Sequence, residues 1–252
     1  AVKWDLGVNF SLNRSKVLVL SEDKDIFGGE LDNTILKDQL NLMRVGEPMY
    51  VFYGYVEDGY DENGHIVYKN MDDDPAITAA DKTIIGDPNP DFLVNLTTAV
   101  SYKGFTLSAF FQSSIGNDIY SLSMAAQAYD YGYNGNTLRE VYYNHWTLEN
   151  PTAKYPNLDQ TSYKMSDRFV YDGSFVRLKN LELAYDVPCA RNKFIKRARV
   201  YVSAQNLFTI TSYPFWDPDI NANGGGSSMI QGVDSYCYPS ARTYTIGCRL
   251  TF

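Results

Sequence analysis

The chain has 252 residues, a formal net charge of −8 and a hydrophobic share of 44%. The negative charge argues against a nucleic-acid partner, because phosphate binding needs basic patches. A mean hydropathy of −0.31, together with the lack of any apolar run near ~18 residues, argues against a helical membrane protein.

Residues 2–10 alternate between apolar and polar or small side chains. The apolar positions are Val2, Trp4, Leu6, Val8 and Phe10. Because successive side chains of a strand point to opposite faces, this pattern predicts a strand with one apolar and one polar face. The pattern starts without a signal peptide or a linker. We therefore expect the true N-terminus to lie upstream and the chain to be a fragment.

The same alternation recurs along the chain and predicts an all-β protein. Strands are expected over 48–58, 92–102, 105–111, 174–187, 199–205 and 243–252. The strand over 174–187 changes phase near Asn180, which either a β-bulge or a change of environment would cause. The aromatic share of 15%, with 21 Tyr, agrees with strands and with membrane–water interfaces.

The connections between these strands are of two kinds. Lys103-Gly104 and 187–197 are short. The long, polar connections are 59–91, 116–166 and 209–240. If the strands run up and down, the long connections all fall at one end, as in outer-membrane barrels with short periplasmic turns and long extracellular loops. Segment 13–47 breaks this rule, because the strand count places it at the short-turn end.

The strand over 92–102 has the length that a membrane barrel needs. About ten steps of ~3.3 Å, tilted by ~45°, cover about 23 Å, close to the ~25 Å apolar band of a barrel wall. The sequence therefore predicts an antiparallel transmembrane β-barrel with long extracellular loops. The alternative is a soluble β-sandwich that buries the apolar face of each strand.

Several stretches carry a resemblance to a known family. They are Thr83 to Phe92 (TIIGDPNPDF), Phe110 to Tyr120 (FFQSSIGNDIY), Asp172 to Leu181 (DGSFVRLKNL), Arg199 to Thr209 (RVYVSAQNLFT), Tyr238 to Thr245 (YPSARTYT) and the terminal Phe252. Taken in this order, they resemble the C-terminal barrel region of the SusC/RagA family of TonB-dependent outer-membrane transporters. The resemblance covers most of residues 48–252.

The resemblance implies a barrel of about 22 strands with a plugged lumen, in which residues 1–252 are the C-terminal part and the plug and N-terminal strands lie outside the chain. It implies import of glycan oligosaccharides or peptides across the outer membrane. The implied partners are a SusD-like lipoprotein lid, the remainder of the barrel and plug, outer-membrane lipid, and the TonB complex. The alternative function is a soluble β-sandwich that binds carbohydrate.

Residues 70–81 overlay a calcium-binding loop. The oxygen ligands would come from Asn70, Asp72, Asp74, the Ala76 carbonyl and Asp81, at the spacing that a calcium ion requires. The loop departs from the pattern at Pro75, where a sharp turn needs glycine, and at Asp81, which is shorter than the usual Glu. The alternative is a solvated acidic loop without a metal.

Aromatic side chains crowd the long loops and are candidate substrate contacts. The candidates are Tyr129, Tyr131, Tyr133, Trp146 and Trp216. Exposed rings of this kind stack on sugars or on peptide side chains, and the alternative is packing among the loops themselves. No spacing of carboxylates selects a catalytic pair, and no common nucleophile or phosphate-loop motif occurs. We therefore expect no enzyme and no certain cofactor.

Phe252 ends the last alternating strand, with Tyr244, Ile246 and Leu250 on the same face. Such an ending resembles the assembly signal of outer-membrane barrels, and the alternative is an aromatic residue placed there by chance. We also expect residues 250–252 to pair with the first strand of the barrel, which lies outside this chain.

Overall fold

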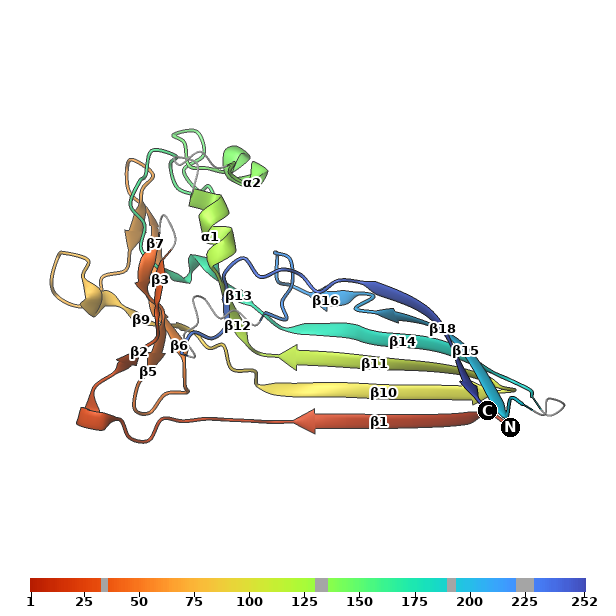
Figure 1. The fold of residues 1–252 in the computed structure, drawn as a ribbon. Coiled ribbons are helices and arrows are strands. Elements are labelled where there is room, and N and C mark those ends of the chain that lie inside the picture. The colour runs from red at the N-terminus through yellow and green to blue at the C-terminus, as the bar shows by residue number, and fades with distance from the viewer. Residues whose placement is uncertain (33–35, 130–135, 190–193, 221–228) are drawn as a thin grey trace.

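A long antiparallel sheet forms one end of the protein in the computed structural model, which describes residues 1–32, 36–129, 136–189, 194–220 and 229–252 (Figure 1). Its long strands are β1 (Lys3–Ser11), β10 (Phe92–Tyr102), β11 (Phe105–Ile115), β14 (Phe175–Val187), β15 (Arg197–Gln205) and β18 (Thr243–Thr251). They are neighbours in that order, and the short β16 (Thr209–Thr211) also pairs with β14. The strands therefore run up and down as the sequence predicts.

The sheet separates apolar from polar side chains. One row of directly paired residues crosses all the long strands and is apolar throughout: Trp4, Val100, Leu107, Leu183, Val202 and Ile246. The neighbouring row on the opposite face consists of Asp5, Ala99, Ser108, Glu182, Ser203 and Thr245. Trp4 is 65% exposed and Ile246 is 84% exposed. A β-sandwich would bury this apolar face, so its exposure argues against the sandwich alternative.

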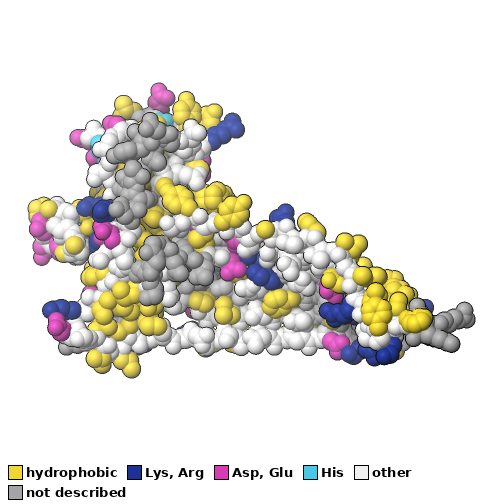
Figure 2. Space-filling model, viewed as in Figure 1, with side chains coloured by type: hydrophobic (Ala, Val, Ile, Leu, Met, Phe, Trp, Pro, Cys, Tyr) yellow, Lys and Arg dark blue, Asp and Glu magenta, His cyan; other side chains and the backbone are white. Residues whose placement is uncertain are grey.

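Short and long connections lie at opposite ends of the sheet. Lys103 and Gly104 join β10 to β11 with φ values of 46° and 87°, which is the type I′ turn that suits a two-residue hairpin. The chain termini lie at this same end (Figure 1). Figure 2 shows hydrophobic side chains gathered over the sheet near the termini. The long connections fold together at the other end.

The strand expected over 48–58 is present in part, as β6 (Val51–Gly54) and the start of β7 (Glu57–Tyr60), but it does not belong to the long sheet. β6 pairs with β5 (Asn41–Met43) and β9 (Thr83–Gly86), and β7 pairs with β8 (Ile66–Tyr68). Because β1 pairs directly with β10, residues 12–91 form one long connection at the long-loop end. This arrangement removes the exception that segment 13–47 posed.

The long connections form a compact unit that we call the loop body. Its remaining elements are η1 (Ser21–Asp23), β2 (Ile26–Phe27), β3 (Glu30–Asp32), β4 (Lys37–Gln39), η2 (Ala79–Asp81), β12 (Asp118–Ser121), α1 (Leu122–Tyr129), α2 (Arg139–Tyr143), η4 (Asp167–Phe169), β13 (Val170–Asp172) and β17 (Val233–Asp234). Leu40, Phe52 and Tyr120 are fully buried in one hydrophobic cluster there. The hydrophobic core thus lies in the loops, whereas the sheet carries its apolar side chains outside. In the described part of the chain, no helix combines the length and apolar character needed to cross a membrane.

The phase change near Asn180 is confirmed as a β-bulge. Phe110 pairs with Asn180, but the next residue, Phe111, pairs with Leu178, so Lys179 is the extra residue. The amide of Asn206 donates to the Lys179 carbonyl at 3.1 Å. The bulge marks the point where β14 changes its partner from β15 to β16.

Candidate functional site

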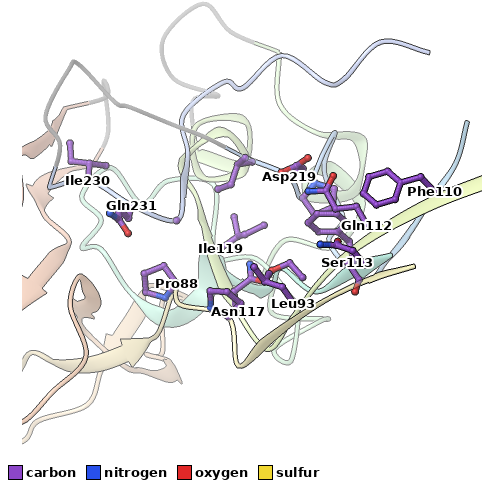
Figure 3. A pocket seen from close by; sticks show the side chains of 17 residues that line it. Pro88, Leu93, Phe110, Gln112, Ser113, Asn117, Ile119, Asp219, Ile230 and Gln231 are labelled. Atoms are coloured by element: carbon purple, nitrogen blue, oxygen red, sulfur yellow. The ribbon is translucent and has the colours of Figure 1, made fainter. Parts of the chain in front are cut away.

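A cavity of about 550 Å³ lies between the polar face of the sheet and the loop body (Figure 3). We call it the mouth cavity. The sheet contributes Leu93, Asn95, Phe110, Gln112, Ser113, Ser114 and Phe175. The loop body contributes Pro88, Pro90, Asn117, Ile119, Pro218, Asp219, Ile220, Ile230, Gln231 and Gly232.

Most polar groups of the mouth cavity are uncharged amides and hydroxyls. Asn95 and Gln112 are directly paired on neighbouring strands, and the Ser114 hydroxyl donates to Asn117 Oδ1 at 2.7 Å. Among the described lining residues, Asp219 is the one with a charged side chain. These groups can bind a polar ligand reversibly through hydrogen bonds, because amides both donate and accept.

A buried arginine ties the last long loop to the sheet beside this cavity. Arg177 on β14 is 2% exposed, and its Nε donates to Thr209 Oγ1 at 2.9 Å. Its Nη1 donates to Asp219 Oδ2 at 3.2 Å and to Ser240 Oγ at 3.2 Å, and its Nη2 donates to Asp217 Oδ1. The guanidinium therefore has a partner on every nitrogen, which a buried charge requires.

The Asp217 carboxylate is held ionised by its partners. Burial by itself would raise the pKa of Asp217, but hydrogen bonds from the amides of Ser240 and Asp219 and from Arg177 outweigh burial and lower the pKa. The hydrogen bonds that these two backbone amides donate to the Asp217 carboxylate are each 2.9 Å long. An ionised carboxylate beside a buried guanidinium is the stable arrangement there.

A second buried carboxylate anchors the other described end of the same loop. Asp234 accepts a hydrogen bond from the Tyr213 hydroxyl at 2.6 Å and from the Ser123 hydroxyl at 3.1 Å. The Tyr213 oxygen also accepts from the Ser121 hydroxyl at 2.8 Å, because the single Tyr213 hydrogen goes to Asp234. This anchor joins the loop to β12 and α1, independently of the sheet.

In the acidic segment 70–81, the candidate calcium-binding carboxylates already make hydrogen bonds. Asp81 is fully buried and accepts from the amides of Met71 and Thr78, both at 2.7 Å. These bonds lower the pKa of Asp81. Asp72 and Asp74 each accept from a backbone amide two residues later. Within the described ranges, no group of three or more His, Cys, Asp or Glu side chains is placed to hold one metal ion, and calcium at Asn70, Asp72, Asp74, Ala76 and Asp81 stays a prediction.

The candidate aromatic contacts that the structure describes differ in their exposure and in what they pack against. Tyr129 is buried and stacks on Tyr163, with ring centroids 3.8 Å apart. Trp146 is also buried, and its ring lies over Gly64. The structure thus gives both side chains a packing role. Trp216 is 56% exposed and stacks on Phe215, so it remains available to a ligand. The candidates Tyr131 and Tyr133 lie outside the described residues.

The mouth cavity and its anchors were not predicted from the sequence, although one of the stretches quoted above contains Arg177. An arginine on the polar face of a strand, followed later by the Asp217-Pro218-Asp219 motif, is the pattern that would have found the network. Phe252 follows β18 and is 71% exposed, so its role as an assembly signal stays a prediction.

Comparisons with known proteins agree with this architecture. The chain is 32% identical to TonB-dependent receptor P3 of Formosa agariphila, over 99% of this chain and 27% of that relative. It is 28% identical to TonB-dependent receptor SusC of Bacteroides thetaiotaomicron, over 99% of this chain and 24% of that relative. The chain therefore spans about a quarter of the length of these relatives. No family model matches the chain.

Solved structures show the same likeness. The structure of the RagAB peptide transporter superposes with a TM-score of 0.80 at 25% identity, over all of this chain and 27% of that chain. The RagAB peptide importer in its open-open state gives a TM-score of 0.77 at 26% identity, with the same coverage. These findings confirm the resemblance to SusC/RagA-type TonB-dependent receptors and the fold class, a stretch of antiparallel wall from an outer-membrane β-barrel.

Proposed function

We propose that this chain is the C-terminal part of a SusC/RagA-type TonB-dependent importer and that it supplies wall strands and extracellular loops for nutrient passage across the outer membrane. The observation that carries the proposal is the exposed apolar row from Trp4 to Ile246, which crosses every long strand. Such an apolar face is more stable against lipid than against water, because exposing apolar surface to water costs free energy.

The proposed mechanism is gated passage without covalent chemistry. The polar face would line a water-filled lumen, and the mouth cavity lies where that lumen would open among the loops. Amide and hydroxyl groups such as Asn95, Gln112 and Ser114 hydrogen-bond either to sugar hydroxyls or to peptide groups. The lining is therefore compatible with glycan oligosaccharides and with peptides.

The proposed partners follow from the same architecture. The free edges of β1 and β18 would pair with the remainder of the barrel, because an unpaired strand edge is unstable in a bilayer. A plug and the TonB complex would act through parts of the protein outside this chain. A SusD-like lipoprotein would cover the loop body, and support for it comes from the likeness to SusC and RagAB.

Uptake by the full-length protein tests the proposal. A deletion strain carrying the wild-type gene should grow on a glycan or a peptide pool that the empty deletion strain cannot use, and growth should require TonB. Gln112→Ala should reduce uptake at an unchanged surface level. Ser108→Ala, on the polar face but outside the mouth cavity, is the matched control. Equal growth of the deletion and complemented strains on both pools would contradict the proposal.

A further inference from the structure

One guanidinium joins a residue that lines the mouth cavity to a residue that anchors the last loop. Asp219 lines the cavity and accepts from Arg177. Asp217 is buried, lies outside the cavity lining, and forms an ion pair with the same guanidinium. We propose that Arg177 is a positioning residue that holds residues 217–220 against the polar face and so sets the wall of the cavity that carries Asp219.

Local charges and burial support this role. Arg177 is directly paired with Gln112, a cavity residue on β11, so it lies next to the wall of the cavity that the sheet forms. Lys179 Nζ lies 3.8 Å from Asp219 Oδ2, so the cluster of Arg177, Lys179, Asp217 and Asp219 is balanced in charge. Removing the buried cation would leave Asp217 buried without its partner, which is strongly unfavourable. The loop would then open locally rather than stay closed.

Loss of Arg177 is not expected to unfold the loop body. The Asp234 anchor, made by Tyr213, Ser121 and Ser123, does not involve Arg177. Lysine is a poor replacement, because an ammonium cannot present the planar fork that contacts Thr209, Ser240 and both carboxylates at once. The role therefore predicts a graded series in which wild type holds the segment best, R177K holds it less well, and R177M least.

The chain offers a matched control in Arg199. It lies on the neighbouring β15 and has two carboxylate partners, Glu182 at 3.4 Å and Asp186 at 3.5 Å. Its side chain is 32% exposed, and Glu182 and Asp186 both lie on β14 rather than in the last loop. R199M thus removes the same chemical group from the same sheet without touching residues 217–220.

The experiment measures how often residues 217–220 open in the full-length protein. Ile220, which is half-buried in the cavity lining, is replaced by cysteine in a version without other cysteines. A membrane-impermeant maleimide is added to intact cells, and the labelling rate is normalised to the amount of folded, surface-exposed protein. R177M should raise the rate by at least about tenfold and R177K by less, since local opening limits access. R199M should change it by less than about twofold, because partly exposed ion pairs contribute little.

Unchanged labelling in folded R177M, or an equal rise in R199M, would overturn the proposal. If R177M does not reach the cell surface, the labelling rates of R177K and R199K are compared instead. A higher rate in R177K than in R199K supports the proposal, and equal rates overturn it. The relevance of Arg177 to a substrate rests on the proposed import function, but the labelling readout does not. A full-length protein that imports no nutrient would contradict the proposed import function, and the labelling rates would still test the role of Arg177.

Discussion

The ring of Tyr201 covers Gly247 across the pair of strands β15 and β18. The two residues are direct partners in the register, and a Cβ atom built on Gly247 would lie 2.6 Å from Tyr201 Cζ. A strand glycine marks a place where another group approaches closely. Gly247 therefore gives the ring its position and helps to fix the register of the last strand.

Replacing Gly247 by valine should destabilise the last hairpin. The added side chain would force the Tyr201 ring away, at a cost of about 1–3 kcal/mol for overpacking. The measurement is the temperature at which the purified full-length barrel loses its folded mobility on a gel. Thr245→Val on the same strand is the control, and an unchanged midpoint in Gly247→Val would show that the ring contact has no role in stability.

The anchor at Asp217 should weaken at acid pH. The pKa of Asp217 in the folded protein lies below the ordinary value of 3.8. Ionised Asp217 therefore stabilises the closed loop at every pH above 3.8. That contribution is lost as the pH falls through the lowered pKa. Labelling of the Ile220→Cys reporter, with a thiol reagent active in acid, should therefore rise below pH 3.8. The rise should be absent in Asp217→Asn, and a rise of equal size there would assign it to another group.

Asp81 should stabilise the acidic segment with or without a metal. Its carboxylate caps the short helix η2 through the amide of Thr78 and ties the start of the segment to that cap through the amide of Met71. Asp81→Asn should therefore speed trypsin cleavage within 69–82 in the presence of a chelator. Calcium binding, if the sequence prediction holds, should slow cleavage of the wild type further. Equal wild-type cleavage with calcium and with chelator would refute the calcium prediction and leave the capping role intact.

Removing Phe252 should lower assembly of the full-length protein into the outer membrane. The side chain is exposed at the end of β18, where its ring is free to contact lipid or the assembly machinery. Quantifying surface protein in the deletion variant against Phe252→Tyr, which keeps an aromatic ring, measures the effect. Wild-type surface levels in the deletion variant would contradict the prediction.

The wall of the barrel could be predicted from the sequence because its rule is local. Alternation at Trp4 and Leu6, or at Leu107 and Ala109, reflects two solvents on two faces and needs no knowledge of partners. The apolar residues of 48–58 obey the same local rule but lie in the loop body. Period alone cannot distinguish lipid contact from a small buried sheet.

The mouth cavity depends on contacts between residues far apart in the sequence and therefore escaped prediction. Arg177 contacts Asp217 across forty positions of the chain, and the arginine on a polar strand face and the Asp217-Pro218-Asp219 motif have to be considered together before they indicate the pairing. Trp146 likewise could not be placed from the sequence. Its position in a long loop suggested an exposed ring, but the ring is buried over Gly64. Burial of such rings follows from how the loops fold together.

The environment of alternate residues on β11 in a lipid bilayer tests most directly whether this sheet is the wall of a membrane barrel. Spin labels are placed one at a time over 106–112 in a cysteine-free full-length protein, and collision rates with oxygen and with a water-soluble nickel complex are measured. Labels at Leu107, Ala109 and Phe111 should favour oxygen, and labels at Thr106, Ser108 and Gln112 should favour nickel. Collision rates without a period of two, or nickel access to both sets, would contradict a wall with lipid on one face and water on the other.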